Sequence, residues 1–179
     1  EIDKNYEHIA SANGWVIRSG TTLDASIIKK ADSLSVIGRA GVGIDNVDIS
    51  AATRKGVVVM NTPDANTISA AEHTLALLLS LSRNVSIGHH SLLAGNWDRH
   101  KFVGSEIRNK TLGIVGLGKI GREVMQRAQG FGMKIIGYDP FIKEDMFRSD
   151  EIKLLELDEL VEKSDFITVH IPLTANTEN

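Results

Sequence analysis

The chain has 179 residues, of which 42% are hydrophobic and 24% charged, proportions that exclude a disordered tail and suit a globular protein. The formal net charge of −3 gives no general attraction to nucleic acid or to an anionic membrane. Because the chain contains no cysteine, disulfides, thiolate catalysis and cysteine-bound metal sites are also excluded.

The sequence carries no sign of a membrane-spanning or secretory segment. Its longest apolar run, residues 75–81, is too short to span a bilayer, and residues 1–6 do not resemble a signal peptide. We therefore expect a soluble, cytoplasmic protein without a metal, nucleic-acid or membrane partner.

The first third of the chain alternates between helical and strand-like patterns. Helices are expected at residues 1–12, 24–31 and 48–55, and strands at residues 15–18, 34–38 and 57–61. The order strand, helix, strand is typical of a parallel sheet, so the expected fold class is α/β. Residues 39–45 follow the second strand, at the sheet edge where open α/β sheets bind ligands.

A long helical pattern covers residues 67–93, with Asn66 or Thr67 as its N-cap. Apolar residues lie on nearly all sides of this helix, which indicates burial by more than one neighbour. We expect it to cross between domains or to pack against another subunit.

A loop at residues 95–104 combines two large aromatics, Trp97 and Phe102, with three basic or potentially basic side chains. Exposed aromatics beside Arg and Lys often mark an interface. The alternative is that the two aromatics anchor the loop to its own core, and the sequence does not separate these interpretations.

The motif G-x-G-x-x-G is formed by Gly116, Gly118 and Gly121. A short apolar strand precedes it and a helix begins near Lys119, so the free N–H groups of that helix would face an anion. The first glycine allows a tight turn, the second admits a pyrophosphate close to the backbone, and the third lets helix and strand pack.

A second strand, residues 134–138, ends at Asp139. A carboxylate there can accept hydrogen bonds from the ribose hydroxyls of an adenosine and would repel a 2′-phosphate, which favours NAD over NADP. The alternative is a glycine turn that serves only helix–sheet packing, with Asp139 as an ordinary loop carboxylate.

The remaining residues predict a strand-like turn and helix at 152–161 and a third parallel strand at 165–170, which Pro172 ends. The sheet therefore stops after three strands. We expect the chain to be part of a longer protein.

Five motifs occur in order: RAGVGIDN (39–46), MNTP (60–63), SAAE (69–72), GIVGLGKIG (113–121) and VHIP (169–172). Together they make the chain similar to the D-isomer-specific 2-hydroxyacid dehydrogenases over almost its whole length. The resemblance implies Rossmann-like doubly wound parallel sheets in two partial domains. Residues 1–63 would be part of a substrate-binding domain, and residues 64–179 part of an NAD-binding domain that starts with the long helix.

The resemblance also implies an activity and a partner. Members of this family pass a hydride between NAD and C2 of a hydroxy acid, and they dimerise mainly through the NAD-binding domains. The motifs are most similar to those of members that oxidise 3-phosphoglycerate to 3-phosphohydroxypyruvate, the first step of serine biosynthesis. We therefore expect a phosphorylated hydroxy acid as substrate and a homodimer.

Site residues follow from the resemblance position by position. Those expected to bind substrate are Arg18, Arg39, Gly41, Val42, Gly43, Asn66 and Arg99, the last reaching the neighbouring subunit. Those expected to bind the cofactor are Val42, Gly116, Gly118, Lys119, Ile120, Gly121, Asp139, His170, Ile171, Pro172 and Thr177.

No catalytic residue is expected in this chain, because the arginine, glutamate and histidine of the family lie beyond residue 179. The chain alone should therefore turn over no substrate. Two alternatives remain open: another 2-hydroxyacid dehydrogenase, acting on glyoxylate, hydroxypyruvate, lactate or formate, and a non-catalytic NAD-sensing module similar to the related corepressors.

Overall fold

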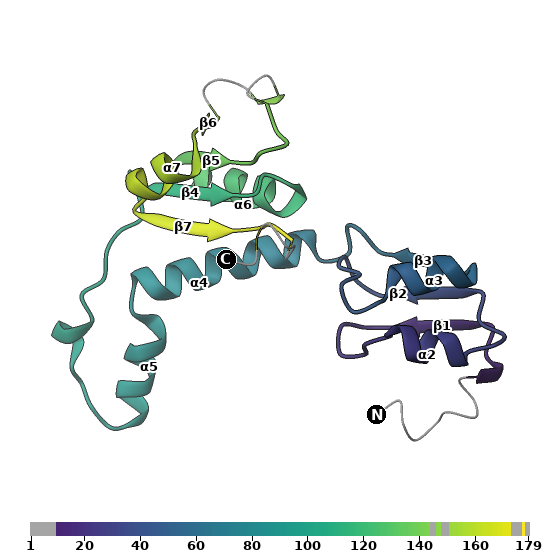
Figure 1. Ribbon diagram of the computed structural model, residues 1–179. Coiled ribbons are helices and arrows are strands. Elements are labelled where there is room, and N and C mark those ends of the chain that lie inside the picture. The colour runs from purple at the N-terminus through teal and green to yellow at the C-terminus, as the bar shows by residue number, and fades with distance from the viewer. Residues whose placement is uncertain (1–9, 144–145, 148–150, 173–176, 178–179) are drawn as a thin grey trace. The chain divides into compact units, whose positions relative to one another are not determined.

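The chain is built around two separate parallel β-sheets, one in each of two units (Figure 1). The computed structural model describes residues 10–143, 146–147, 151–172 and 177. The first unit is Glu1–Asn66 and the second is Thr67–Asn179. The helix expected at residues 1–12 lies almost wholly outside the described residues.

The first unit holds three parallel strands in the order β1-β2-β3. The strands are β1 (Gly14–Ile17), β2 (Val36–Arg39) and β3 (Val58–Asn61). The helices that connect them are α2 (Ala25–Lys30) and α3 (Ile49–Lys55). The predicted alternation of strands and helices is confirmed in this unit.

Local capping explains where these two helices begin and end. The side chain of Asp24 accepts hydrogen bonds from the N–H groups of Ser26 and Ile27, at 2.8 and 3.0 Å, and so caps α2. Asp48 caps α3 in the same way, and α3 ends at Gly56, whose φ of 74° is left-handed.

The second unit holds a four-stranded parallel sheet, in the order β6-β5-β4-β7 within the described residues. The strands are β4 (Thr111–Val115), β5 (Lys134–Tyr138), β6 (Lys153–Leu154) and β7 (Phe166–Val169). The helical elements are α4 (Thr67–Ser82), α5 (Val85–Leu93), the 3-10 helix η2 (Arg99–Phe102), α6 (Lys119–Gly130) and α7 (Leu157–Lys163). The expectation of three strands is corrected by β6, which the sequence indicated only as a strand-like turn.

Helices cover both faces of the second sheet. A Cβ added to Gly113 would contact Leu160 of α7, whereas Ile114 lies beside Gly121 of α6. Because successive strand residues point to opposite faces, α6 and α7 lie on opposite sides of β4. The sheet is therefore doubly wound, as the sequence predicted.

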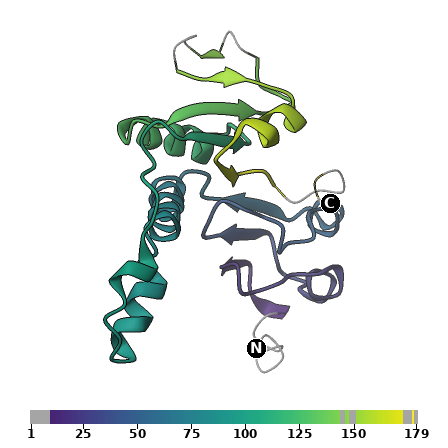
Figure 2. The same cartoon turned by 90° about the vertical axis from the view of Figure 1, so that its left-hand side faces the viewer.

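The prediction of one long helix over residues 67–93 is wrong. Asn84 has a φ of 55°, in the left-handed region, and it separates α4 from α5. A right-handed helix cannot continue through such a residue. Figure 1 and Figure 2 both show α5 turning away from the line of α4.

Within the single chain, only part of residues 67–93 is buried, and packing of the rest against another subunit stays a prediction. Ala71 and Leu75 of α4 belong to the core cluster of the second unit, but α5 has no buried residue. Several of its apolar side chains are exposed: Val85, Ile87, Leu92 and Leu93. In the following loop Trp97 is 75% exposed, so the anchoring interpretation does not hold for that residue, while Phe102 is half-buried.

None of the helices in the described part of the chain combines the length and the apolar character that crossing a membrane requires.

Candidate functional site

The glycine motif forms a tight turn between β4 and α6. Gly116 has a φ of 93°, and its N–H donates to the carbonyl of Tyr138 at 2.8 Å, which ties the start of the turn to the end of β5. A Cβ on Gly116 would stand 2.6 Å from the carbonyl oxygen of His170. Both the conformation and the space therefore require glycine here.

The other two glycines differ in what surrounds them. A Cβ on Gly121 would collide with the carbonyl oxygen of Gly116, so this glycine lets α6 approach the turn closely. A Cβ on Gly118 would meet no heavy atom within 4 Å. The turn is thus packed on one side and open at Gly118, directly before the first residue of α6.

This arrangement fits the diphosphate of a dinucleotide. Gly118 is the N-cap of α6, and the first N–H groups of a helix carry a partial positive charge and lack partners within the helix. An anion can reach them where no side chain stands in front. In this first turn Lys119 is exposed, while Ile120 is half-buried against the core.

The carboxylate of Asp139 lies against the glycine turn. Its Oδ2 accepts a hydrogen bond from the N–H of Leu117 and its Oδ1 accepts one from the N–H of Phe141, each at 2.9 Å. Leu117 itself is fully buried. The structure therefore brings together the turn and the acidic strand end that the sequence paired.

Asp139 also lines a cavity of about 630 Å³ at the ends of β5 and β6. Two further acids, Glu156 and Glu159, line the same cavity, and a hydrogen bond from Lys163 lowers the pKa of Glu159. The residues described as lining it include no Lys or Arg. A negative 2′-phosphate would be repelled by such surroundings, whereas ribose hydroxyls would not.

The predicted cofactor residues of the second unit that lie outside the turn and Asp139 follow the end of β7, whereas Val42 lies in the first unit. The N–H of His170 donates to Val115 at 2.8 Å, and the side chain of Ile171 lies beside Gly116. The hydroxyl of Thr177 donates to the carbonyl of Pro172 at 2.7 Å. His170 and Ile171 therefore border the glycine turn, while the binding roles of Pro172 and Thr177 stay predictions.

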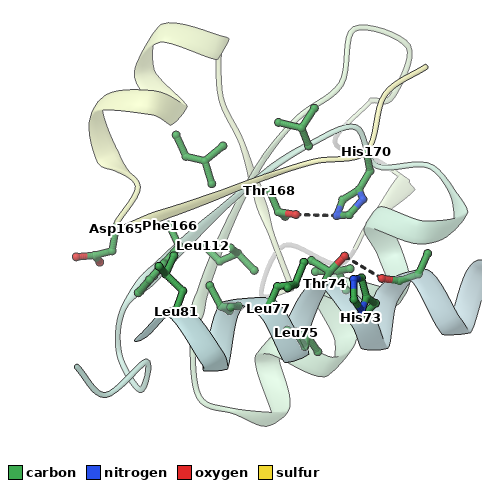
Figure 3. A pocket seen from close by; sticks show the side chains of 15 residues that line it. His73, Thr74, Leu75, Leu77, Leu81, Leu112, Asp165, Phe166, Thr168 and His170 are labelled. Carbon is green, nitrogen blue, oxygen red and sulfur yellow. Dashed lines mark hydrogen bonds between the residues drawn. The ribbon is translucent and has the colours of Figure 1, made fainter. Parts of the chain in front are cut away.

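A cavity of about 660 Å³ lies between α4 and β7 (Figure 3). On one side it is lined by His73 and Leu77 of α4. On the other side it is lined by Thr168 of β7 and by His170, which directly follows that strand. The Nε2 of His170 lies 2.9 Å from the Thr168 hydroxyl, and burial lowers the pKa of this histidine. None of the three motif glycines lines this cavity.

In the first unit, the predicted substrate residues cluster at the carboxyl ends of the strands. Ile17 pairs with Arg39 across the sheet, so Arg18 follows at the same edge. The Arg39 guanidinium lies over Gly41, whose φ is 151° and whose N–H donates to the Arg39 carbonyl at 2.9 Å. A substrate carboxylate at Gly41 would therefore compete with an existing hydrogen bond.

Two asparagines that the sequence analysis did not assign hold this loop. Asn61 donates from Nδ2 to the carbonyl of Val42 at 2.7 Å, and Asn46 donates to the carbonyl of Arg18 at 3.0 Å. The sequence feature that could have pointed to these asparagines was their position in the motifs RAGVGIDN and MNTP. The space beside Gly43 is occupied by the Asp45 carboxylate, whose Oδ1 would lie 2.6 Å from an added Cβ.

The last two predicted substrate residues lie apart from this loop in the sequence. Asn66 is exposed at the end of the first unit. Arg99 is exposed in η2 of the second unit, and its sequence neighbours Asp98 and Lys101 form an ion pair with each other. Their binding roles stay predictions. The described residues contain no group of three or more potential metal ligands.

The sequence analysis missed Arg122, on the first turn of α6. Its Nε donates to the carbonyl of Leu117 at 2.9 Å, so it contacts the glycine turn directly. The only sequence signal was a basic residue immediately after the third glycine.

Comparison with known proteins identifies relatives of both units. Residues 75–179 match the family described as D-isomer specific 2-hydroxyacid dehydrogenase, NAD binding domain. The chain is 49% identical to a D-3-phosphoglycerate dehydrogenase of Methanocaldococcus jannaschii over 174 residues, which are 97% of this chain and 33% of that protein. It is 50% identical to the rat (Rattus norvegicus) D-3-phosphoglycerate dehydrogenase over 169 residues, 94% of this chain and 32% of that protein.

A solved structure shows the same fold. The NAD-dependent formate dehydrogenase of Staphylococcus aureus, in complex with NAD, matches with a TM-score of 0.89 and 33% identity, over 99% of this chain and 54% of that one. The chain thus spans about a third of the length of the curated relatives it matches and about half of this solved structure.

Proposed function

The chain belongs to the D-isomer-specific 2-hydroxyacid dehydrogenases and carries their NAD-binding domain, and from this premise we propose that it serves as the cofactor-binding and substrate-anchoring part of a D-3-phosphoglycerate dehydrogenase. The proposed reaction oxidises 3-phosphoglycerate to 3-phosphohydroxypyruvate with NAD. The observation that carries the proposal is the hydrogen bond between Asp139 and Leu117 at the open glycine turn.

The residues of the second unit fit the two ends of the cofactor's adenosine diphosphate. The N–H groups at Gly118 and Lys119 would hold the diphosphate, and Asp139 would accept from the ribose hydroxyls. When bound, NAD supplies a hydride acceptor. Ile171, beside Gly116, would exclude water from the turn.

The residues of the first unit fit an anionic substrate. Arg39 is the last residue of β2, and Arg18 directly follows the neighbouring strand β1. Guanidinium groups bind phosphate through paired hydrogen bonds. The backbone of Gly41, Val42 and Gly43 would orient the carboxylate of the same substrate. Two anion sites in one unit favour a phosphorylated hydroxy acid over lactate or formate.

The second unit also supports a proposal on assembly. The exposed apolar residues of α5 and the exposed Trp97 suit an interface with a second copy of the chain. In such a homodimer, Arg99 would contribute to the phosphate site of the neighbouring subunit.

The test uses the natural full-length protein that contains this sequence. NAD reduction is measured with 3-phosphoglycerate, lactate and glyoxylate, and NADH binding is measured by fluorescence. In the double variant Arg18→Ala/Arg39→Ala we expect binding of 3-phosphoglycerate to be lost while NADH binding is retained. Arg54→Ala, an exposed arginine on α3 away from the strand ends, is the control and should change neither.

Each other outcome points to a different function. Turnover of lactate or glyoxylate, but not of 3-phosphoglycerate, would assign the protein to another 2-hydroxyacid dehydrogenase. Tight NADH binding without turnover of any hydroxy acid would indicate the NAD-sensing module. Absence of NADH binding would contradict the dinucleotide assignment itself.

A further inference from the structure

Arg122 is held in a fixed position by two contacts. Its Nε donates to the carbonyl of Leu117 at 2.9 Å, and its guanidinium carbon lies 4.8 Å from the ring centroid of Phe147. The side chain is half-buried between them. A guanidinium that stacks on an aromatic ring and donates from Nε has little freedom to rotate.

The carbonyl that Arg122 binds belongs to the same peptide unit as the N–H of Gly118. The peptide bonds of the described residues are trans, and in a trans peptide the carbonyl and the N–H point in opposite directions. Since the Leu117 carbonyl is directed at Arg122, the Gly118 N–H is directed away from it. Arg122 therefore sets the orientation of the N–H at the open position of the turn.

The preceding peptide unit is fixed from the other side. The N–H of Leu117 donates to Asp139, so Leu117 is hydrogen-bonded through both its N–H and its carbonyl. Its side chain is also fully buried. The turn thus has its diphosphate-binding geometry before any ligand arrives, which removes an ordering cost from binding.

From these contacts we propose that Arg122 is a positioning residue for the cofactor's diphosphate, and that it acts through the Leu117 carbonyl rather than by contact with the ligand. The proposal rests on the proposed NAD-binding function of the turn. It adds a residue of α6 whose substitution changes cofactor affinity while the glycines and Asp139 stay intact.

The experiment compares three variants of the natural full-length protein. Arg122→Met removes the donor and the charge, and Arg122→Lys keeps the charge without the guanidinium geometry. Arg127→Met is the matched control, because Arg127 lies on the same helix and is half-buried but bonds to Glu123 rather than to the turn. The ligands are NADH, ADP-ribose, which contains the diphosphate, and adenosine, which does not.

We expect Arg122→Met to lower the affinity for NADH and for ADP-ribose by about tenfold, the effect of one hydrogen bond from a charged donor. The affinity for adenosine should not change. Arg122→Lys should lower the affinities for NADH and ADP-ribose by a similar factor. The loss should be the same at low and high salt, because a lost backbone orientation is not screened. Hydrogen exchange of the ligand-free protein should become faster over residues 113–121 and unchanged elsewhere.

Three results would overturn the proposal. One is an affinity equal to that of Arg127→Met, and another is a loss that disappears at high salt, which would mean direct attraction between charges. The third is an equal loss for adenosine with faster exchange throughout the protein, which would mean general destabilisation. If the wild-type protein binds no NADH, the proposed function fails, but exchange at residues 113–121 still decides whether Arg122 fixes the turn.

Discussion

The carboxylate of Asp139 and the backbone N–H of Leu117 are joined by a hydrogen bond of 2.9 Å, although 22 positions separate the two residues. This bond fixes the end of β5 to the glycine turn. An ionised carboxylate has about four lone-pair positions, and Leu117 and Phe141 use two of them. Acceptor capacity therefore remains for the two hydroxyls of a ribose.

Replacing Asp139 with Asn should weaken NADH binding more than NADPH binding. The amide has one acceptor oxygen, so one of the two N–H groups loses its partner, and the charge that repels a 2′-phosphate is gone. We expect NADH affinity to fall on the order of tenfold. Fluorescence titration with both cofactors measures the ratio, and an unchanged NADH to NADPH ratio would contradict the proposed role. Asp158→Asn, an exposed carboxylate on α7 that does not line this cavity, is the control.

Alanine at the second glycine should lower cofactor affinity, whereas alanine at the third should lower stability. At Gly121 the new methyl group collides with the Gly116 carbonyl, so we expect a loss of about 1–3 kcal/mol in unfolding free energy. At Gly118 the methyl group enters open space, so stability should change by less than about 1 kcal/mol. NADH affinity should nevertheless fall, because the methyl group stands before the N–H groups. Urea denaturation and NADH titration of both variants separate the two effects.

Asn84 should tolerate glycine better than alanine. Its left-handed φ of 55° costs an alanine about 1 kcal/mol, a penalty that glycine does not have. Asn84→Ala should therefore be less stable than Asn84→Gly by about that amount in urea denaturation. Equal stability of the two variants would mean that residues 83–84 do not hold this conformation in solution.

Asp165 should make stability depend on pH. The N–H of Thr111, at 2.8 Å, and then Lys110 lower the pKa of Asp165 below its usual range. Because the folded pKa is below the unfolded one, this carboxylate stabilises the fold above a pH of about 4, and the stabilisation disappears as pH falls through the lowered pKa.

The measurement for Asp165 is urea denaturation of the wild type and Asp165→Asn across the acidic range. The difference in unfolding free energy between the wild type and Asp165→Asn should be constant above a pH of about 5 and shrink in stronger acid. Lys110→Met should reproduce part of the difference. A gap that widens on acidification would show that the pKa is raised rather than lowered.

Patterns with a short range in the sequence predicted most of the fold. Asp24 and Asp48 stand before helices because their side chains bond to the next N–H groups, and Gly56 ends a helix because it accepts a left-handed φ. The glycine spacing and the strand that ends at Asp139 predicted the turn, since these residues are fixed by backbone geometry. In each case a local physical requirement selects the residue type.

What the sequence did not reveal depends on contacts or on a single dihedral angle. The apolar pattern of residues 67–93 continues through Asn84, so periodicity alone gave one helix where the structure has two. The role of Arg122 depends on which way its side chain turns on α6, and neither composition nor spacing determines that. The exposure of Trp97 was equally undetermined, because the sequence does not say which side of a loop faces solvent.

One of the two edge strands of the second sheet within the described residues, β7, affects how these residues behave as a separate protein. Within the described residues β7 pairs only with β4, and its Ile167 and Val169 side chains are 46% and 59% exposed. An unpaired apolar strand edge recruits strands from other molecules, which is how aggregates begin. A charged side chain at position 167 or 169 would keep such a preparation soluble.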